Sequence, residues 1–174
     1  MEAISKTTPM SSKETMVKMV LDRWYALIRN CDNFLSAITD EQLQKEIAPN
    51  RNRGIYLLGH LTAVHDDMLP LLNFGDKMYP ELSEIFLKSP DKTIAEIPSA
   101  EELRASWSKI NDVLSQQFDS LQADEWFEKH TSVSAEDFIM EPHRNKLNIV
   151  ITRTSHLSYH LGQLILLKPS GLSD

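Results

Sequence analysis

Four long stretches of the chain repeat hydrophobic residues with the 3.6-residue period of an α-helix. They predict helices over about 11–38, 54–69, 99–121 and 146–168. Two long connections lie between them, at about 73–98 and 123–145, and the second is compatible with a short strand near Phe138. No stretch alternates strongly enough to predict a sheet. The sequence therefore predicts an all-α protein, a four-helix bundle with two long connections.

The ends of these helices carry their own sequence signals. A Ser or Thr followed three residues later by Glu or Gln forms a capping box, which satisfies free backbone N–H groups at a helix start. Three such patterns precede predicted helices: Ser11-x-x-Glu14, Thr39-x-x-Gln42 and Ser99-x-x-Glu102. The second predicts a short helix through Ile47. Because proline interrupts helices, Pro70 and Pro169 are predicted to end the second and fourth long helices.

All four long helices are predicted to bury an apolar stripe, and the fourth also has a second organised face. The stripe of the first helix is predicted to run from Met16 to Ile38. The core stripe of the fourth helix is Leu147, Val150, Ile151, Thr154, Leu157, Leu161, Leu164 and Ile165. Its other stripe lies well over 90° away on the helical wheel and is Ile149, Arg153, His156, His160, Gln163 and Leu167. Such a second face indicates that something packs or binds there.

The second face of that helix carries a histidine pair. His156 and His160 are four residues apart, so their Cβ atoms lie about 5–6 Å apart on one face of the helix. This spacing lets both imidazoles bind one small cation. His60, in Gly59-His60-Leu61, is the best candidate for a third ligand. The spacing predicts a three-histidine metal site with open coordination positions, although it is also compatible with exposed histidines.

Neighbouring residues are candidates for holding these ligands or a substrate. Asp67 shares a helix face with His60, and Arg153 and Gln163 share the face of the histidine pair. Metal-bound imidazoles usually donate their second N–H to such neighbours. Arg153 is also a candidate for receiving an anionic group, and exposure to solvent is the ordinary alternative for all three. His65 is not predicted as a ligand, because it lies about 140° from His60 on the wheel.

The other histidines and the single cysteine are predicted to have ordinary roles. The two histidines of the second connection, His130 and His143, are expected to be solvated. Cys31 is the only cysteine, which excludes an internal disulfide and a Cys-rich zinc finger. It falls in the apolar stripe of the first helix and is predicted to be a small buried residue. The three tryptophans are predicted to pack in or at the edge of the core.

Composition narrows the class of protein further. A length of 174 residues fits one domain, expected at 11–169 between an N-terminal tail (1–10) and a C-terminal tail (170–174). The net charge of −7 argues against nucleic-acid binding, which usually requires a basic face. No apolar run approaches the ~20 residues that span a bilayer, so no membrane association is expected. Residues 1–10 lack the apolar core of a secretion signal, which favours a cytoplasmic protein.

Other common catalytic motifs are missing from the sequence. It contains no glycine-rich phosphate loop, no Gly-x-Ser-x-Gly elbow and no His-Glu-x-x-His zinc motif. The Glu-x-x-His motif of di-iron bundles is also missing from both histidine-bearing helices. The three-histidine cluster is therefore the main candidate for chemistry.

The sequence resembles the DinB/YfiT-like superfamily of bacterial helical-bundle metalloproteins. The resemblance rests on Gly59-His60-Leu61, on His156-x-x-x-His160-x-Gly162-Gln163-Leu164, and on the order and spacing of four helices over roughly 11–168. It implies a four-helix bundle that holds a divalent metal, often nickel or zinc, through the three matching histidines. It also implies frequent homodimers. Members with assigned activities include low-molecular-weight-thiol S-transferases and a mycothiol-dependent maleylpyruvate isomerase.

Three hypotheses about function follow, and the sequence leaves them open. The first is a metal-dependent enzyme, either a thiol S-transferase that uses a low-molecular-weight thiol as co-substrate or a hydrolase. The second is a non-catalytic metal- or ligand-binding protein associated with stress. The third is a purely structural protein with exposed histidines. Three imidazoles suit zinc, nickel, copper or iron, so the residues alone do not identify the metal.

Overall fold

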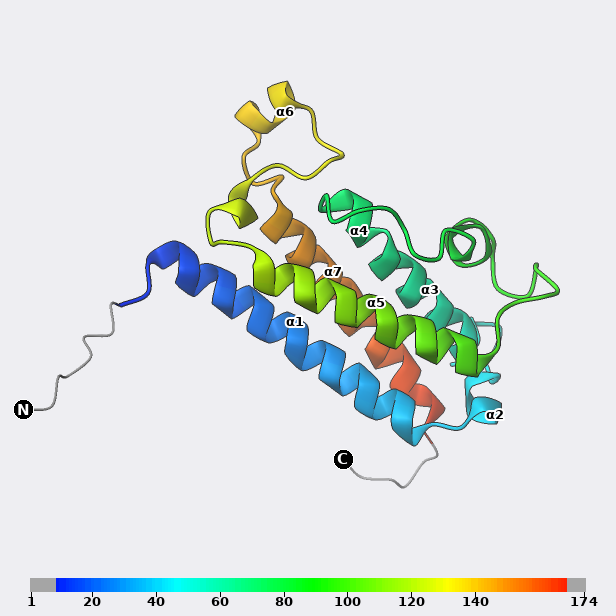
Figure 1. The fold of residues 1–174 in the computed structure, drawn as a ribbon. Helices are drawn as coiled ribbons and strands as arrows, with labels where there is room; N and C mark the ends of the chain where they lie inside the picture. The colour runs from blue at the N-terminus through cyan, green and yellow to red at the C-terminus, as the bar shows by residue number, and fades with distance from the viewer. Residues whose placement is uncertain (1–8, 169–174) are drawn as a thin grey trace, which may run out of the picture.

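The computed structural model describes residues 9–168, and this part of the chain is built from helices without a strand. Four long helices form the framework (Figure 1): α1 (Ser12–Ala37), α3 (Gly54–Asp66), α5 (Ala100–Ser120) and α7 (Lys146–Leu164). Shorter helices join them: α2 (Asp40–Leu43), α4 (Met68–Leu71), η1 (Glu84–Lys88), η2 (Glu125–Phe127), α6 (Ala135–Met140) and η3 (Ile165–Leu167). The prediction of an all-α protein is confirmed.

The four long helices pack as a bundle whose interior contains two clusters of buried apolar residues. α1 packs against α7, α3 packs against α5, and α3 also packs against α7. The two long connections are those predicted, one between α4 and α5 and the other between α5 and α7 (Figure 1). Since α3 and α7 are neighbours, side chains from these two helices can meet although they are about a hundred residues apart in sequence.

All three predicted capping boxes are present. Ser11, Thr39 and Ser99 each accept a hydrogen bond from the backbone N–H three residues later, and the Glu or Gln side chain at that position accepts one in return. These reciprocal bonds satisfy backbone donors that have no partner within the helix. The starts of α1, α2 and α5 are therefore set by local sequence.

The core contains the residues that the apolar stripes indicated, with exceptions at their margins. The three tryptophans are buried, as is Cys31, whose burial raises the pKa of its thiol to about 12. Three predicted core residues lie outside: Met16 is 52% exposed, Ile151 45% and Ile165 46%. Each stands at the edge of a stripe, where the bundle no longer covers the helix. In α1, Val17 is buried in place of Met16.

Three predictions about the connecting segments were wrong. The short helix predicted through Ile47 ends at Leu43, because Glu46 pairs with Arg53 in an isolated bridge. Pro70 does not end a helix; it lies inside α4, in the first turn, where a missing N–H removes no helical hydrogen bond. Phe138 belongs to helix α6, which begins after the capping residue Ser134, and not to a strand.

The expected tails lie almost wholly beyond the part of the chain that is described. Residues 1–8 and 169–174, including the helix-ending position predicted for Pro169, are outside it. The described part of the fourth helical segment consists of α7 followed by one 3-10 turn, η3. Among the described residues, no helix combines the length and the apolar character needed to cross a membrane.

Candidate metal centre

Three imidazoles converge where α3 packs against α7. His60 comes from the middle of α3, while His156 and His160 come from successive turns of α7. The Nε2 atom of His156 lies 3.1 Å from Nε2 of His60 and 3.1 Å from Nε2 of His160. All three ligand atoms lie within 4.8 Å of one another, and the three residues are partly buried. The structure thus brings together the three histidines that the sequence analysis selected.

The outer nitrogens of two of these rings have fixed partners. The Nδ1 atom of His60 lies 3.0 Å from the backbone carbonyl oxygen of Phe86, and Nδ1 of His160 lies 2.7 Å from the side-chain oxygen of Gln163. Both partners are acceptors, so each Nδ1 carries the proton and donates it. In the neutral rings, the Nε2 atoms of His60 and His160 therefore present lone pairs to the centre.

If all three rings are neutral, the centre has too few N–H donors to form a hydrogen bond with both lone pairs. His156 Nε2 can carry at most one proton, so it can donate to only one of the two nitrogens that lie 3.1 Å away. A cation between the three atoms removes the conflict. Imidazole nitrogens at about 2.1 Å from one ion are separated by about 3.0 Å in octahedral and about 3.4 Å in tetrahedral geometry. The two 3.1 Å separations fit this range.

The packing around His60 depends on a glycine. The aromatic ring of Phe86, in η1, lies so close to Gly59 that a Cβ atom there would meet its carbons at 2.4 Å. This close approach places the Phe86 carbonyl beside His60. The hydroxyl of Tyr56, one turn earlier in α3, donates to the carbonyl of Ser89 at 2.7 Å and holds the end of the same segment. Gly59 and the first connection therefore orient the imidazole of His60.

Burial keeps the imidazoles of α7 neutral. The pKa of His156 is lowered to about 4, first by burial and then by the charges of His160, His60 and Arg153. The pKa of His160 is also lowered by burial, an effect that Gln163 partly offsets because it accepts from the ring. Neutral rings at pH 7 have free lone pairs, and metal binding requires such lone pairs.

Comparisons with known proteins agree with this architecture. The family model of the DinB superfamily matches residues 23–164, most of the chain. The chain belongs to the DinB superfamily. A crystal structure described as that of the conserved protein of a locus from Enterococcus faecalis is similar in fold, with a TM-score of 0.57 and 16% sequence identity over 91% of this chain and 96% of that one. The comparison with curated proteins found no match.

A fourth histidine of this DinB-superfamily protein lies in the bundle interior, and the sequence analysis left it out. The imidazole of His65 is fully buried between Trp24 and Trp107, each at 4.8 Å between ring centroids. Its Nδ1 donates to the side-chain oxygen of Asn111 at 2.9 Å. Burial lowers its pKa to about 3. The wheel argument excluded His65 correctly as a direct neighbour of His60, but it gave no signal for this role.

Of the two remaining histidines, one is exposed as predicted and the other is buried. His143 is exposed, as predicted. His130 was expected to be solvated but is buried, with a relative exposure of 9%. Its Nδ1 accepts a hydrogen bond from the backbone N–H of Ser132, so it forms part of the folded connection between η2 and α6.

A cavity that none of the three histidines lines contains two of the other candidate residues, Asp67 and Arg153. It measures about 350 Å³ and is lined by Asp67, Pro70, Leu71, Lys77, Thr131, Ser132 and Arg153. Asp67 does not contact the histidines; its carboxylate contacts the ammonium group of Lys77. Arg153 precedes His156 by one helical turn, and its Nε atom is buried without a hydrogen-bond partner in the described protein. The cavity thus contains an ion pair and one further cation.

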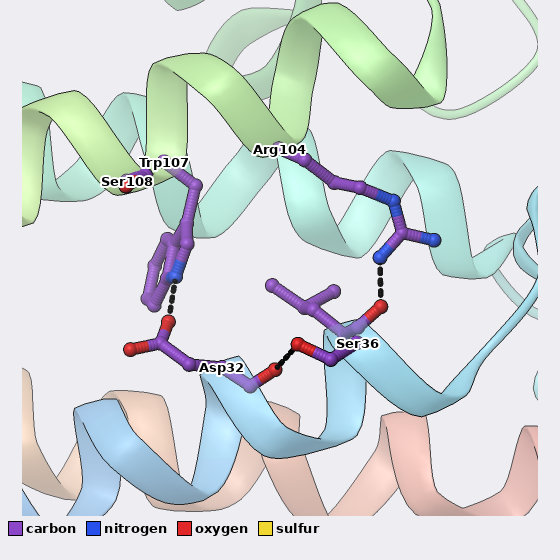
Figure 2. A pocket seen from close by; sticks show the side chains of 6 residues that line it. Asp32, Ser36, Arg104, Trp107 and Ser108 are labelled. Carbon is purple, nitrogen blue, oxygen red and sulfur yellow. Dashed lines mark hydrogen bonds between the residues drawn. The ribbon is translucent and has the colours of Figure 1, made fainter.

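A second hollow, between α1 and α5, lacks the features of a reactive site. It measures about 370 Å³, and Figure 2 shows Asp32, Ser36, Arg104 and Trp107 around it. Its polar groups bond to the protein itself: Trp107 Nε1 donates to Asp32 at 2.8 Å, and Arg104 donates to the carbonyl of Ile38 at 2.9 Å. These bonds tie α5 to α1 and fix the ring of Trp107 against His65.

Proposed function

We propose that His60, His156 and His160 bind a divalent metal ion and that the protein is a metal-dependent enzyme. The observation that carries this proposal is the meeting of three imidazole nitrogens, two of which present lone pairs because their other nitrogens donate elsewhere. Such an arrangement is stable when a cation lies between the nitrogens. Nickel and zinc are the expected metals because the family resemblance implies them; the imidazole ligands alone would also suit copper or iron.

The number of ligands favours catalysis over a structural role. Structural zinc sites usually have four protein ligands, whereas catalytic sites have three and keep a position for water or substrate. Among the described residues, no other His, Cys, Asp or Glu joins the three histidines in the cluster. A divalent ion held there supplies Lewis acidity, which promotes deprotonation of a coordinated water or thiol near neutral pH.

We propose thiol S-transfer as the reaction, with hydrolysis as the alternative. The family resemblance supports transfer, and the cavity lined by Arg153, one helical turn from His156, supports an acidic co-substrate. In that cavity the carboxylate of Asp67 is already paired with Lys77, so the guanidinium of Arg153 is the unbalanced charge. A guanidinium binds carboxylates in a two-pronged geometry. Arg153 would therefore hold the anionic group of a thiol whose sulfur faces the histidines.

The test combines metal analysis with a screen for turnover. Purified protein should contain close to one nickel or zinc ion per chain, and His60→Ala and His156→Ala should lose it, whereas the exposed-histidine control His143→Ala should retain it. Metal-loaded protein is then mixed with an electrophilic bimane and with cysteine, glutathione, coenzyme A or mycothiol. Unchanged metal content in the ligand variants would refute the site. A metal-bound protein inactive with every thiol, and with ester and amide substrates, would favour the non-catalytic binding protein.

We also propose that the protein forms a homodimer through the face shared by α1 and α7. Several large apolar side chains are exposed along this face: Met16, Met19, Ile151 and Tyr159. A shallow groove between the helices, lined in part by Met19, Val20 and Ile151, adds a surface for complementary packing. Light scattering after size exclusion should give twice the chain mass, and Ile151→Asp should convert the dimer to a monomer. A wild-type monomer at 100 μM would refute this proposal.

A further inference from the structure

The start of α3 is capped by a residue from outside the helix. The other three long helices begin after Ser11, Ser99 and Asn145, whose side chains accept from backbone N–H groups of the first turn. The capping residue of α3, Arg53, makes no such bond with its side chain. Its backbone N–H instead donates at 2.7 Å to the carboxylate of Asp91, in the first connection. The first connection thus completes the start of α3, where the helix dipole also favours a negative charge.

The same carboxylate forms an ion pair with the Arg53 guanidinium. Arg53 Nη2 lies 2.7 Å and Nε 3.1 Å from Oδ1 of Asp91, and the Asp91 side chain is only 4% exposed. Burial opposes ionisation, but the hydrogen bonds from Arg53 outweigh it and hold the pKa of Asp91 below its usual range. Hydrogen bonds between charged groups are roughly twice as strong as neutral ones. The pair therefore fixes the backbone at residue 91 against the start of α3.

The next two turns of α3 hold the preceding part of the same connection. Tyr56, one turn after Arg53, donates its hydroxyl to the carbonyl oxygen of Ser89 at 2.7 Å, and this hydroxyl lies 3.4 Å from the carbonyl oxygen of Phe86. His60, one turn further, donates through Nδ1 to the same Phe86 carbonyl at 3.0 Å. Successive turns of α3 thus bind successive points of the connection, and the last of these bonds belongs to a candidate metal ligand.

The Phe86 carbonyl has no donor within its own helix. Phe86 lies in η1, a π-helix of five residues that packs against α3. In an α-helix its carbonyl would accept from the N–H of residue 90, but that residue is Pro90, which has no N–H. Single π-helical turns are rare and occur frequently at functional sites. The irregular turn therefore leaves one carbonyl for His60.

We propose that Arg53, Tyr56 and Asp91 form a latch that positions a metal ligand. The latch holds residues 84–91 on α3, and a carbonyl of this segment holds the imidazole of His60. The inference rests on the proposed metal site. Loss of the acceptor of a metal-bound imidazole weakens metal binding about 10- to 100-fold. Here the acceptor belongs to the backbone, so its position depends on the side chains that hold the segment.

The latch also couples the segment to the occupancy of the metal site. Thermodynamic linkage is reciprocal, so bound metal must favour docking of residues 84–91 by the same factor that docking adds to metal affinity. A residue that only stabilised the fold would not have this property. The coupling therefore distinguishes a positioning role of the latch from a purely structural one.

The first experiment measures metal affinity by chelator competition. Tyr56→Phe keeps the aromatic ring but removes the hydroxyl, and Asp91→Asn removes the charge that Arg53 binds. Each should weaken nickel or zinc binding about 3- to 10-fold, the factor that the net contribution of one hydrogen bond allows. The control Glu128→Gln breaks another partly buried ion pair, formed with Lys146 at 2.8 Å between the second connection and α7, and should bind metal like wild type.

The outcomes separate the latch from the metal site. Wild-type affinity in both latch variants would refute the latch and leave the proposed metal site standing. Equal losses in the latch variants and in Glu128→Gln would also refute it, because the effect would then be a general loss of rigidity. A wild-type protein that binds no metal overturns both the latch and the site.

The second experiment needs no variant, so a folding defect does not obscure it. Backbone amide hydrogen exchange is measured on metal-free and on zinc-loaded wild-type protein. Zinc should slow the exchange of amides in residues 84–91 at least about threefold, as linkage requires, and leave the amides of α6, in the other connection, unchanged. Unchanged exchange in 84–91, or equal slowing in both segments, would overturn the proposal.

Discussion

The two glycines of the family motifs, Gly59 and Gly162, should respond in opposite ways to the same substitution. Both lie in helices, where replacing glycine by alanine normally stabilises a protein by about 0.5–1 kcal/mol. At Gly162 a Cβ atom would meet nothing within 4 Å, so Gly162→Ala should show this gain. At Gly59 the new Cβ would lie 2.4 Å from two carbons of the buried Phe86 ring. That separation is far below van der Waals contact, and the ring must move.

The expected size of the effect follows from these two contributions. Forcing an extra carbon into a packed core destabilises by about 1–3 kcal/mol, and the severe overlap at Phe86 places Gly59→Ala near the upper end. Subtracting the gain in helix propensity leaves a net loss of about 2 kcal/mol. For a chain of this size that loss corresponds to a fall of roughly 4–8 °C in Tm. Gly162→Ala should instead raise Tm by roughly 1–4 °C.

The displacement of Phe86 also affects the metal centre. The carbonyl oxygen of Phe86 accepts from His60, so a shifted segment loosens one ligand. Gly59→Ala should therefore weaken metal binding about tenfold or more, whereas Gly162→Ala should leave it unchanged. The assays are thermal unfolding of metal-free protein by circular dichroism and chelator competition on the loaded protein. If Gly59→Ala is as stable and binds metal as well as Gly162→Ala, the reasoning from the close approach is wrong.

Three further predictions follow from the site. Burial lowers the pKa of His65 to about 3, whereas an unfolded histidine titrates near 6.5, so the unfolded state binds more protons between these pH values. Metal-free protein should therefore lose about 2 kcal/mol of stability from this group between pH 7.5 and pH 5. Urea unfolding of His65→Phe should show a smaller loss over the same pH range. Gln163→Leu removes the acceptor of His160 and should weaken metal binding about 10- to 100-fold in chelator competition. Gln163→Glu keeps an acceptor, so its metal affinity should stay within a few-fold of wild type. Arg153→Gln should raise KM about 10- to 100-fold for cysteine and leave KM for cysteamine, which lacks the carboxylate, unchanged; equal KM changes for both thiols would exclude Arg153 as an anion site.

The parts of the fold that were predicted correctly depend on local sequence. Each capping box consists of residues three apart, so its hydrogen bonds can be inferred without knowing the rest of the structure. The errors occurred where tertiary packing decides. Pro70 fits into the first turn of a new helix, which depends on where α3 happens to end. Phe138 has strand propensity but follows a helix cap at Ser134, and the cap decided its conformation.

At the candidate site, too, the features set by local sequence were predicted and those set by tertiary packing were not. His156 and His160 are neighbours on one helix, so their spacing alone indicated a shared face, and His60 required only that α3 pack against α7. The acceptors of the ligands could not be derived in the same way. Gln163 is three residues from His160 and was identified, but the Phe86 carbonyl comes from an irregular connection and belongs to the backbone, which carries no residue-specific signal.

The burial of His65 could not have been found from periodicity, because it depends on side chains of two other helices. The wheel argument asks which side chains of one helix share a face, and by that test His65 points away from His60. Its buried position depends on Trp24 of α1 and on Trp107 and Asn111 of α5. One side of α3 thus carries a candidate metal ligand, and another carries a histidine into the core. A buried histidine without a charge partner is held neutral, because burial opposes its protonation and Asn111 accepts from its Nδ1.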